Sequence, residues 1–212
     1  MTPLYRWQEE CLSTWKNSEY RGIAEVTTGA GKTLMAVKGS IMLDEEMNNN
    51  LSVYIVVPKV ALKKQWKEVL IKNGVKDIEI WSNAKKKKGK YTIMTINTAR
   101  NILPLLVEKD FINMKHILLI LDEVHHYGSP ANSHLFDFIY SKHYEGSLYH
   151  SLGLSATTKV RTLNSILIPK VGDIFFRYNL SDALSDGIVN DFVIFNIAVH
   201  FNEEEKLIYD SI

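Results

Sequence analysis

The sequence predicts an α/β fold in which helices cover both faces of a mostly parallel sheet. Three observations lead to this prediction. Short apolar runs alternate with amphipathic segments along most of the chain, as they do in repeated strand–helix units. Two of the runs, residues 51–57 and 117–121, are apolar at nearly every position, which is typical of strands buried on both faces. A glycine-rich turn also leads from one predicted strand directly into a helix.

The order of the elements follows from the apolar spacing and from the residues that interrupt it. Residues 4–15 place apolar side chains at helical spacing, which predicts an amphipathic opening helix. Pro58 ends one strand, and Asn73 with Gly74 ends the helix after it. Strands are predicted at residues 22–26, 51–57, 78–81, 91–96, 117–121, 149–154, 174–178 and 192–201. Further helices are predicted from Lys32 onward, at 60–72, and at 97–107 with an interruption near Pro104.

The composition is that of an ordinary globular protein. Of the 212 residues, 46% are hydrophobic and 23% are charged, and this length can bury a sizeable core. A net charge of +1 means that any nucleic-acid partner has to be met by local basic patches. The single cysteine, Cys11, excludes an internal disulfide and suits a reducing compartment. Since the sequence has neither a signal-peptide pattern nor a membrane-spanning apolar run, we expect a cytoplasmic protein without a membrane partner.

The glycine-rich turn predicts a cradle for phosphate groups. Its residues are Val26, Thr27, Thr28, Gly29, Ala30, Gly31, Lys32 and Thr33, between a strand and a helix. The backbone N–H groups of such a turn and the N-terminus of the helix point at anionic oxygens. Lys32 would reach the β- and γ-phosphates, and the Thr33 hydroxyl would ligate Mg²⁺. The strict motif has a glycine where Val26 stands, so the alternative is a glycine-capped loop that binds nothing.

Two carboxylates follow the most apolar strand. Asp122 and Glu123 would lie at its carboxyl end, where parallel sheets bind their ligands. Asp122 would hold Mg²⁺ through water, and Glu123 would orient and deprotonate an attacking water. Together with Lys32 they are the predicted catalytic residues of an ATP hydrolase. The alternative is an acidic turn that only ends a core strand.

Three motifs together resemble those of a known family. Residues 29–33, 122–125 and 155–157 resemble, in this order and spacing, motifs I, II and III of superfamily two helicases, with motif II of the DExH kind. The resemblance implies a RecA-like P-loop NTPase lobe with ATP and Mg²⁺ as cofactors. Gln8 resembles the glutamine that reads adenine in this family. The residues implied to link the ATP state to a second lobe are His125, Ser155, Ala156 and Thr157.

Further segments resemble the family motifs that contact nucleic acid. Pro58 and Lys59 lie in a stretch similar to motif Ia, and residues 95–100 resemble motif Ib. Residues 183–192 are similar to the exit of the first lobe in the branch of restriction-enzyme motor subunits and excision-repair helicases. Tyr5 and Arg6 depart from the branch, as does Lys59, where many members have threonine. The implied contacts to backbone phosphates are Pro58, Lys59, Thr95, Thr98 and Arg100.

The resemblance also implies that the chain is one of two lobes that act together. We expect residues 1–201 to form the first RecA-like lobe and residues 202–212 to begin a linker to a second lobe. The expected function is that of an ATP-dependent helicase or translocase, acting on DNA rather than RNA. We expect the isolated lobe to hydrolyse ATP slowly or not at all. The alternatives are an RNA helicase, a small-molecule kinase, and a nucleotide-dependent switch that binds nucleic acid without turnover.

Three other features permit more than one interpretation. Residues 85–88, followed by Lys90, form a lysine run that either grips phosphates or is a solvated loop. His125 and His126 lack the usual ligand spacing of a zinc site. Trp66 fits core packing or base stacking.

Overall fold

The computed structural model describes residues 3–82, 87–158 and 161–190, and these form an α/β fold built on one parallel sheet. The sheet has seven strands in the order β3-β4-β2-β5-β6-β1-β7, and every neighbouring pair is parallel. The strands are β1 (Arg21–Val26), β2 (Leu51–Val57), β3 (Ile78–Ile80), β4 (Tyr91–Thr95), β5 (His116–Asp122), β6 (Tyr149–Ser155) and β7 (Ile174–Tyr178). The predicted fold class is confirmed.

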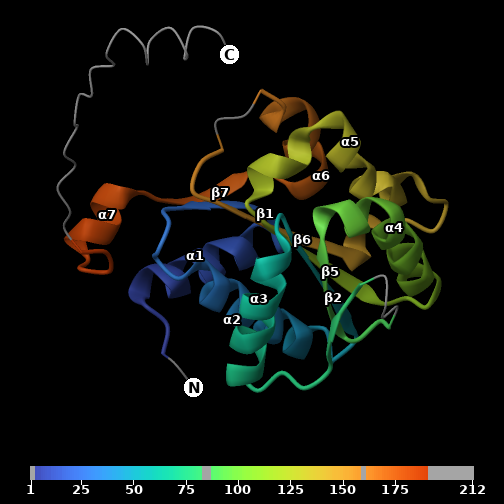
Figure 1. Ribbon diagram of the computed structural model, residues 1–212, viewed down its shortest axis with the longest axis horizontal. Coiled ribbons are helices and arrows are strands. Elements are labelled where there is room, and N and C mark those ends of the chain that lie inside the picture. The colour runs from blue at the N-terminus through green and yellow to red at the C-terminus, as the bar shows by residue number, and fades with distance from the viewer. Residues whose placement is uncertain (1–2, 83–86, 159–160, 191–212) are drawn as a thin grey trace, which may run out of the picture.

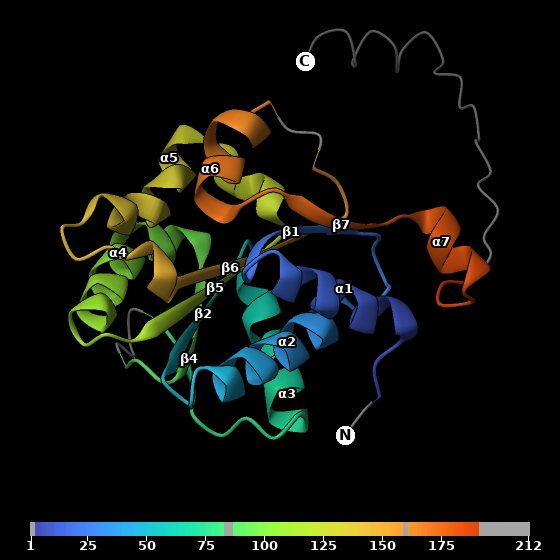
Figure 2. The same ribbon diagram turned by 180° about the vertical axis from the view of Figure 1, so that it is seen from behind.

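Helices cover both faces of the sheet (Figures 1 and 2). The α-helices are α1 (Arg6–Asn17), α2 (Lys32–Glu46), α3 (Val60–Lys72), α4 (Ile96–Ile112), α5 (Pro130–Ser133), α6 (Ile168–Val171) and α7 (Leu180–Ser185). Short helices of other types are η1 (Val124–Gly128), η2 (His134–Tyr140), η3 (Gly146–Leu148) and η4 (Leu163–Leu167). Helices α1, α2 and α3 cover one face, and α4, η2 and α6 cover the other.

Successive side chains of the central strands point to opposite faces of the sheet and so contribute to the core on both faces. In β2, Val53 and Ile55 pack with the cluster under α1, α2 and α3, whereas Tyr54 and Val56 belong to the cluster under α4. All seven residues of β2 are buried. A strand buried on both faces has no polar side, which explains why the sequence of β2 reads as a continuous apolar run.

The structure differs from the sequence predictions at several element boundaries. The expected interruption near Pro104 is wrong, because α4 runs unbroken from Ile96 to Ile112. Buried Leu103 and Val107 hold this helix against the sheet on either side of the proline, which offsets the missing backbone hydrogen bond. Helix α1 begins at Arg6, two residues after the predicted start. The predicted strand at 192–201 and the predicted linker at 202–212 lie outside the described residues.

The parallel arrangement decides where the chemistry can occur. The carboxyl ends of β5, β6 and β1 are adjacent at one edge of the sheet, and each is followed by one of the three predicted motifs. Among the described residues, no helix has the length and apolar character needed to cross a membrane.

Candidate active site

The three predicted motifs meet at one edge of the sheet. Strand β6 lies between β1 and β5, with Glu25 opposite Ser155 and Asp122 opposite Leu154. The phosphate loop, the carboxylates and motif III therefore follow neighbouring strands. This is the crevice at which open parallel sheets bind ligands.

Two glycines shape the phosphate loop. Gly29 and Gly31 have φ angles of 79° and 98°, in the left-handed region that glycine adopts without strain. A Cβ on Gly29 would have no heavy atom within 4 Å, whereas one on Gly31 would lie 2.8 Å from Nε2 of Gln8. Gly31 is the N-cap of α2, so the first turn of this helix faces the loop. Both Thr28 and Gly29 are exposed, so the loop is open to a ligand on that side.

Lys32 lies between the phosphate loop and the carboxylates. Its Nζ donates to the carbonyl oxygens of Val26 at 3.0 Å and Thr27 at 3.2 Å. Burial lowers the pKa of Lys32, and the negative charges of Glu123 and Asp122 oppose this shift. The structure therefore brings the predicted phosphate-binding ammonium within electrostatic reach of both predicted catalytic carboxylates.

Asp122 is buried and is held by a residue that the sequence left undecided. The indole Nε1–H of Trp66 donates to Oδ2 of Asp122 at 2.9 Å. Burial raises the pKa of Asp122, and the hydrogen bond from Trp66 opposes this rise. Trp66 is 1% exposed, which makes it a packed residue rather than a surface for base stacking.

The backbone of Glu123 is strained. Its φ and ψ angles of 53° and 61° lie in the left-handed region, which costs a residue other than glycine on the order of 1 kcal/mol. The chain turns here from β5 into η1, so that Glu123 and His125 approach each other. Nδ1 of His125 lies 3.5 Å from Oε2 of Glu123.

His125 also reaches motif III. Its Nδ1 lies 2.8 Å from Oγ of Ser155. Because the Ser155 hydroxyl donates its one hydrogen to the carbonyl of Thr157 at 2.6 Å, His125 must be the donor in the first contact. Ala156 is half-buried and Thr157 is exposed at this edge. Motifs II and III are thus joined by a direct hydrogen bond.

Gln8 connects the start of α1 to the phosphate loop. Its side chain is fully buried, and its Nε2 donates to the carbonyl of Gly31 at 3.0 Å while its Oε1 accepts from the backbone N–H of Tyr5 at 2.9 Å. The adjacent Trp7 stacks on Tyr178 with ring centroids 4.9 Å apart. A cavity of about 400 Å³ opens beside these aromatic rings, lined by Arg6, Trp7, Glu10, Phe176, Arg177, Tyr178, Asp182, Ser185 and Asp186.

The residues predicted to contact nucleic acid gather at the same edge of the sheet. Pro58 and Lys59 follow β2, and Thr95 ends the neighbouring strand β4, opposite Val57. Oγ1 of Thr95 lies 3.1 Å from Oγ1 of Thr98. In the same first turns of α4, Nη2 of Arg100 donates to Oδ1 of Asn97 at 2.9 Å. Lys59 is exposed.

The oxygen donors at this edge fit Mg²⁺ bound together with a nucleotide. Asp122 and Thr33 offer a carboxylate and a hydroxyl, the hard oxygen ligands that Mg²⁺ prefers. Within residues 3–82, 87–158 and 161–190, no group of three or more histidine, cysteine, aspartate or glutamate side chains could hold a metal ion. A metal held by so few protein oxygens takes its other ligands from phosphates and water, as Mg²⁺ commonly does.

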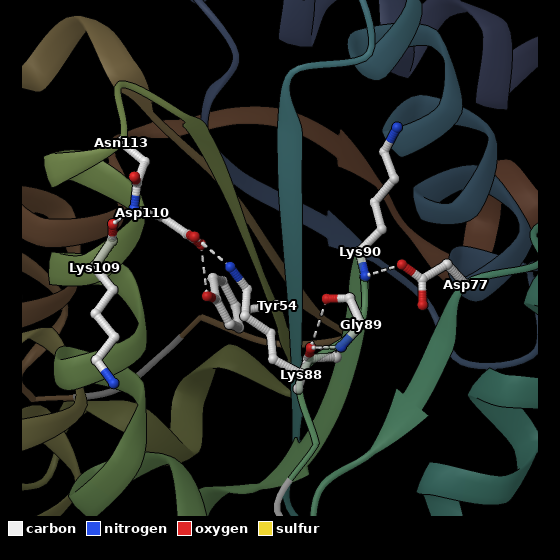
Figure 3. Close-up of polar contacts among 9 residues, drawn as sticks. Tyr54, Asp77, Lys88, Gly89, Lys90, Lys109, Asp110 and Asn113 are labelled. Carbon is white, nitrogen blue, oxygen red and sulfur yellow. Dashed lines mark hydrogen bonds and ion pairs between the residues drawn. The ribbon is translucent and has the colours of Figure 1, made fainter.

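The described part of the lysine run lies at the opposite, amino-terminal edge of the sheet and is paired with acidic side chains. Nζ of Lys87 lies 3.0 Å from Oε1 of Glu79. Lys88 forms an ion pair with buried Asp110, which also accepts a hydrogen bond of 2.7 Å from the Tyr54 hydroxyl (Figure 3). Lys88 therefore compensates a buried carboxylate at the base of the sheet, whereas the exposed Lys87 forms a surface ion pair with buried Glu79.

Residues 2–160 match the family described as "Type III restriction enzyme, res subunit". The chain belongs to this family. The match and the fold confirm the predicted RecA-like, ATP-binding lobe of the superfamily two type.

Relatives of this chain include a longer protein. "DNA 3'-5' translocase XPB2" of Sulfurisphaera tokodaii is 31% identical over 208 residues, which cover 97% of this chain and 42% of the relative. The chain thus spans less than half the length of that protein.

Two solved structures show the same fold. A nuclease-deletion mutant of the Type ISP restriction-modification enzyme LlaGI, in complex with a DNA substrate mimic, has a TM-score of 0.64 and 17% identity, over 88% of this chain and 21% of the mutant chain. The Sulfolobus solfataricus SWI2/SNF2 ATPase core, in complex with double-stranded DNA, has a TM-score of 0.60 and 19% identity, over 81% of this chain and 36% of that core.

Proposed function

We propose that this chain is the ATP-binding first lobe of an ATP-driven DNA translocase or helicase. The observation that carries the proposal is the meeting of Lys32 with Asp122 and Glu123, on the same sheet edge that presents Lys59 and Thr95. Relatives named as a DNA translocase and as an ATPase core bound to double-stranded DNA support DNA as the nucleic acid.

In this proposal the chain's own residues divide the work on ATP between them. The loop N–H groups and Lys32 bind the phosphates, and Asp122 with Thr33 would hold Mg²⁺. When bound, Mg²⁺ neutralises charge on the phosphate oxygens. Glu123 holds the attacking water and takes its proton. Gln8 would read the adenine edge through its amide once that amide, buried in this structure, is released from its contacts with Gly31 and Tyr5.

The proposal includes a second RecA-like lobe as partner. Residues 1–201 would form the first lobe, and residues 202–212 would begin the linker. The second lobe would supply an arginine that places positive charge beyond the γ-phosphate. In related chemistry such an arginine is worth about 10³–10⁵-fold in rate. Opening and closing of two lobes would convert the ATP state into motion along DNA through His125 and residues 155–157. The cytoplasm stays the predicted compartment.

The deciding experiment compares Glu123→Gln with the parent in protein that carries both lobes. The substitution keeps size and hydrogen bonding but removes the base, so we expect ATP affinity within about twofold of the parent and no DNA-stimulated hydrolysis. Calorimetry measures binding, and phosphate release measures turnover. If turnover is as fast in Glu123→Gln as in the parent, Glu123 is not the catalytic base. If the parent binds ATP and DNA without turnover, the protein is a nucleotide-dependent switch.

The 212-residue chain alone provides the complementary test. We expect it to bind ATP weakly, to hydrolyse it slowly or not at all, and to separate no strands. Strong DNA-stimulated hydrolysis by this chain alone would contradict the requirement for a second lobe.

A further inference from the structure

We propose that Trp66 is a positioning residue that fixes the Asp122 carboxylate for Mg²⁺ and makes it sensitive to nucleic acid bound at the start of α3. Both halves rest on the proposed function: the first on its Mg²⁺ site at Asp122, and the second on its nucleic-acid contacts as well. Neither half requires Trp66 to touch the nucleotide or the nucleic acid.

The positioning role follows from the hydrogen bond between the two side chains. An indole has a single donor, and that of Trp66 is given to Oδ2 of Asp122 at 2.9 Å. The exposed fractions of the two residues are 1% and 9%, so neither has room to turn toward solvent. A donor locked by packing thereby selects one rotamer of the carboxylate. Groups that orient a metal ligand in this way are worth about 10- to 100-fold in metal affinity.

The sensitivity to nucleic acid follows from where Trp66 lies in the chain. It is in the second turn of α3, whose N-cap is Lys59 and which follows directly on Pro58. These are the residues predicted to meet backbone phosphates. A helix moves as a stiff unit, so a shift of its first turn also displaces the indole.

A second contact ties motif II to the same strand and helix. The hydroxyl of Tyr127, in η1, donates to the carbonyl of Val56 at 2.7 Å. Val56 lies in β2, two residues before Pro58, and is opposite Leu121 of β5. The segment on both sides of Glu123 is therefore held by β2 and α3, through Trp66 before it and Tyr127 after it. A displacement of β2 and α3 would therefore also move the carboxylates of Asp122 and Glu123.

The first test compares Trp66→Phe with a matched variant. Phenylalanine keeps an aromatic ring in the core but has no donor. Trp15→Phe is the control, because Trp15 is also fully buried and also donates from Nε1, to the carbonyl of Ser151 at 3.0 Å, away from the candidate active site. Calorimetry with a non-hydrolysable ATP analogue measures affinity as a function of Mg²⁺ concentration.

For Trp66→Phe, we expect the Mg²⁺ concentration at half-saturation to rise about tenfold, with unchanged affinity for the analogue in the absence of Mg²⁺. In Trp15→Phe both quantities should stay at the parent values, although both variants lose a buried hydrogen bond. Equal Mg²⁺ dependence in the two variants would overturn the positioning role.

A second measurement uses the unmodified protein and does not depend on how well a variant folds. The indole N–H resonance of Trp66, assigned by triple-resonance experiments on the unmodified protein, should shift when Mg²⁺ is added to the nucleotide-bound protein. The resonance of Trp15 should not shift. If the Trp66 resonance is the same with and without Mg²⁺, the indole does not sense the metal site and the proposal fails.

Addition of a single-stranded oligothymidine tests the link to nucleic acid. We expect the oligonucleotide to lower the Mg²⁺ requirement of the parent but not that of Trp66→Phe. An equal effect in both proteins would overturn the link and leave the positioning role standing. Absence of any oligonucleotide binding would instead count against the proposed function, and it would overturn the second half of the proposal with it.

Discussion

The imidazole of His125 donates from Nδ1 to the hydroxyl of Ser155 at 2.8 Å, which joins the loops after β5 and β6. The direction of this bond is fixed because Ser155 gives its own hydrogen to the carbonyl of Thr157. His125 therefore keeps its proton on Nδ1 when neutral, and its Nε2 is left as an acceptor. Motif II and motif III are coupled within this lobe before a second lobe takes part.

A double-mutant cycle measures this coupling. His125→Ala and Ser155→Ala should each lower the free energy of unfolding in urea, and together they should lower it by about 1 kcal/mol less than the sum of the single effects. The control cycle pairs Ser155→Ala with His126→Ala. His126 is exposed and packs on His125 with ring centroids 4.2 Å apart, so this cycle removes a histidine from the same place while His125 itself is kept. Additive effects in the first cycle would contradict the inferred hydrogen bond.

Lys32 should dominate nucleotide affinity. A charge-assisted contact to phosphate is worth about 1.5–3 kcal/mol, so Lys32→Ala should weaken ATP binding by at least about tenfold. Lys38→Ala, on the same helix but beyond the phosphate loop, should leave the affinity unchanged. Calorimetry measures the ATP affinity of each protein. If a folded Lys32→Ala variant binds ATP as tightly as the parent, Lys32 does not contact the phosphates.

Gln8 should influence both base preference and the phosphate loop. Gln8→Ala removes the donor to the carbonyl of Gly31, so we expect weaker binding of ATP and GTP together with a smaller preference for ATP. Competition binding measures the ratio. Glu9→Ala, an exposed change on the same helix, should alter neither quantity. If both nucleotides bind more weakly but the ratio of the ATP and GTP affinities is unchanged, Gln8 supports the phosphate loop and does not read the base.

The stability of the protein should fall in mild acid because of His150. Burial, together with the neighbouring His116 and Arg21, lowers the pKa of His150 to about 4, against a hydrogen bond to the backbone of Glu19 that raises it. The unfolded chain titrates near a pKa of about 6.5, so between the two values it binds more protons than the folded chain. The free energy of unfolding should therefore fall as the pH drops through this range, by about 2 kcal/mol from pH 7 to pH 5.

Urea unfolding at the two pH values checks this expectation. His150→Gln should remove most of the loss, whereas His134→Gln, at an exposed site, should leave it unchanged. Nδ1 of His116 lies 3.2 Å from Nε2 of His150. Burial lowers the pKa of His116 too, so His116 adds to the same dependence of stability on pH. A pH dependence that is equal in the parent and in His150→Gln would show that His150 is not kept neutral by the fold.

By itself the sequence determined the seven strands that the structure describes, their order along the chain and the residues of the three motifs. The predicted strand at 51–57 agrees with β2, and the one at 117–121 differs from β5 by one residue at each end. These features are local, because apolar periodicity and glycine turns depend on residues that follow one another in the chain. The placement of Lys32 at the start of a helix and of Asp122 at the carboxyl end of a strand was predictable for the same reason.

Only the tertiary structure decided which distant side chains meet. Trp66 and Asp122 are 56 residues apart, and their hydrogen bond exists because β2 and β5 are neighbours in the sheet while α3 lies against them. The pairing of Lys88 with Asp110 likewise depends on how α4 returns to the base of the sheet. A buried donor must find an acceptor in its surroundings, and those surroundings are set by strand order, which no local pattern in the sequence specifies.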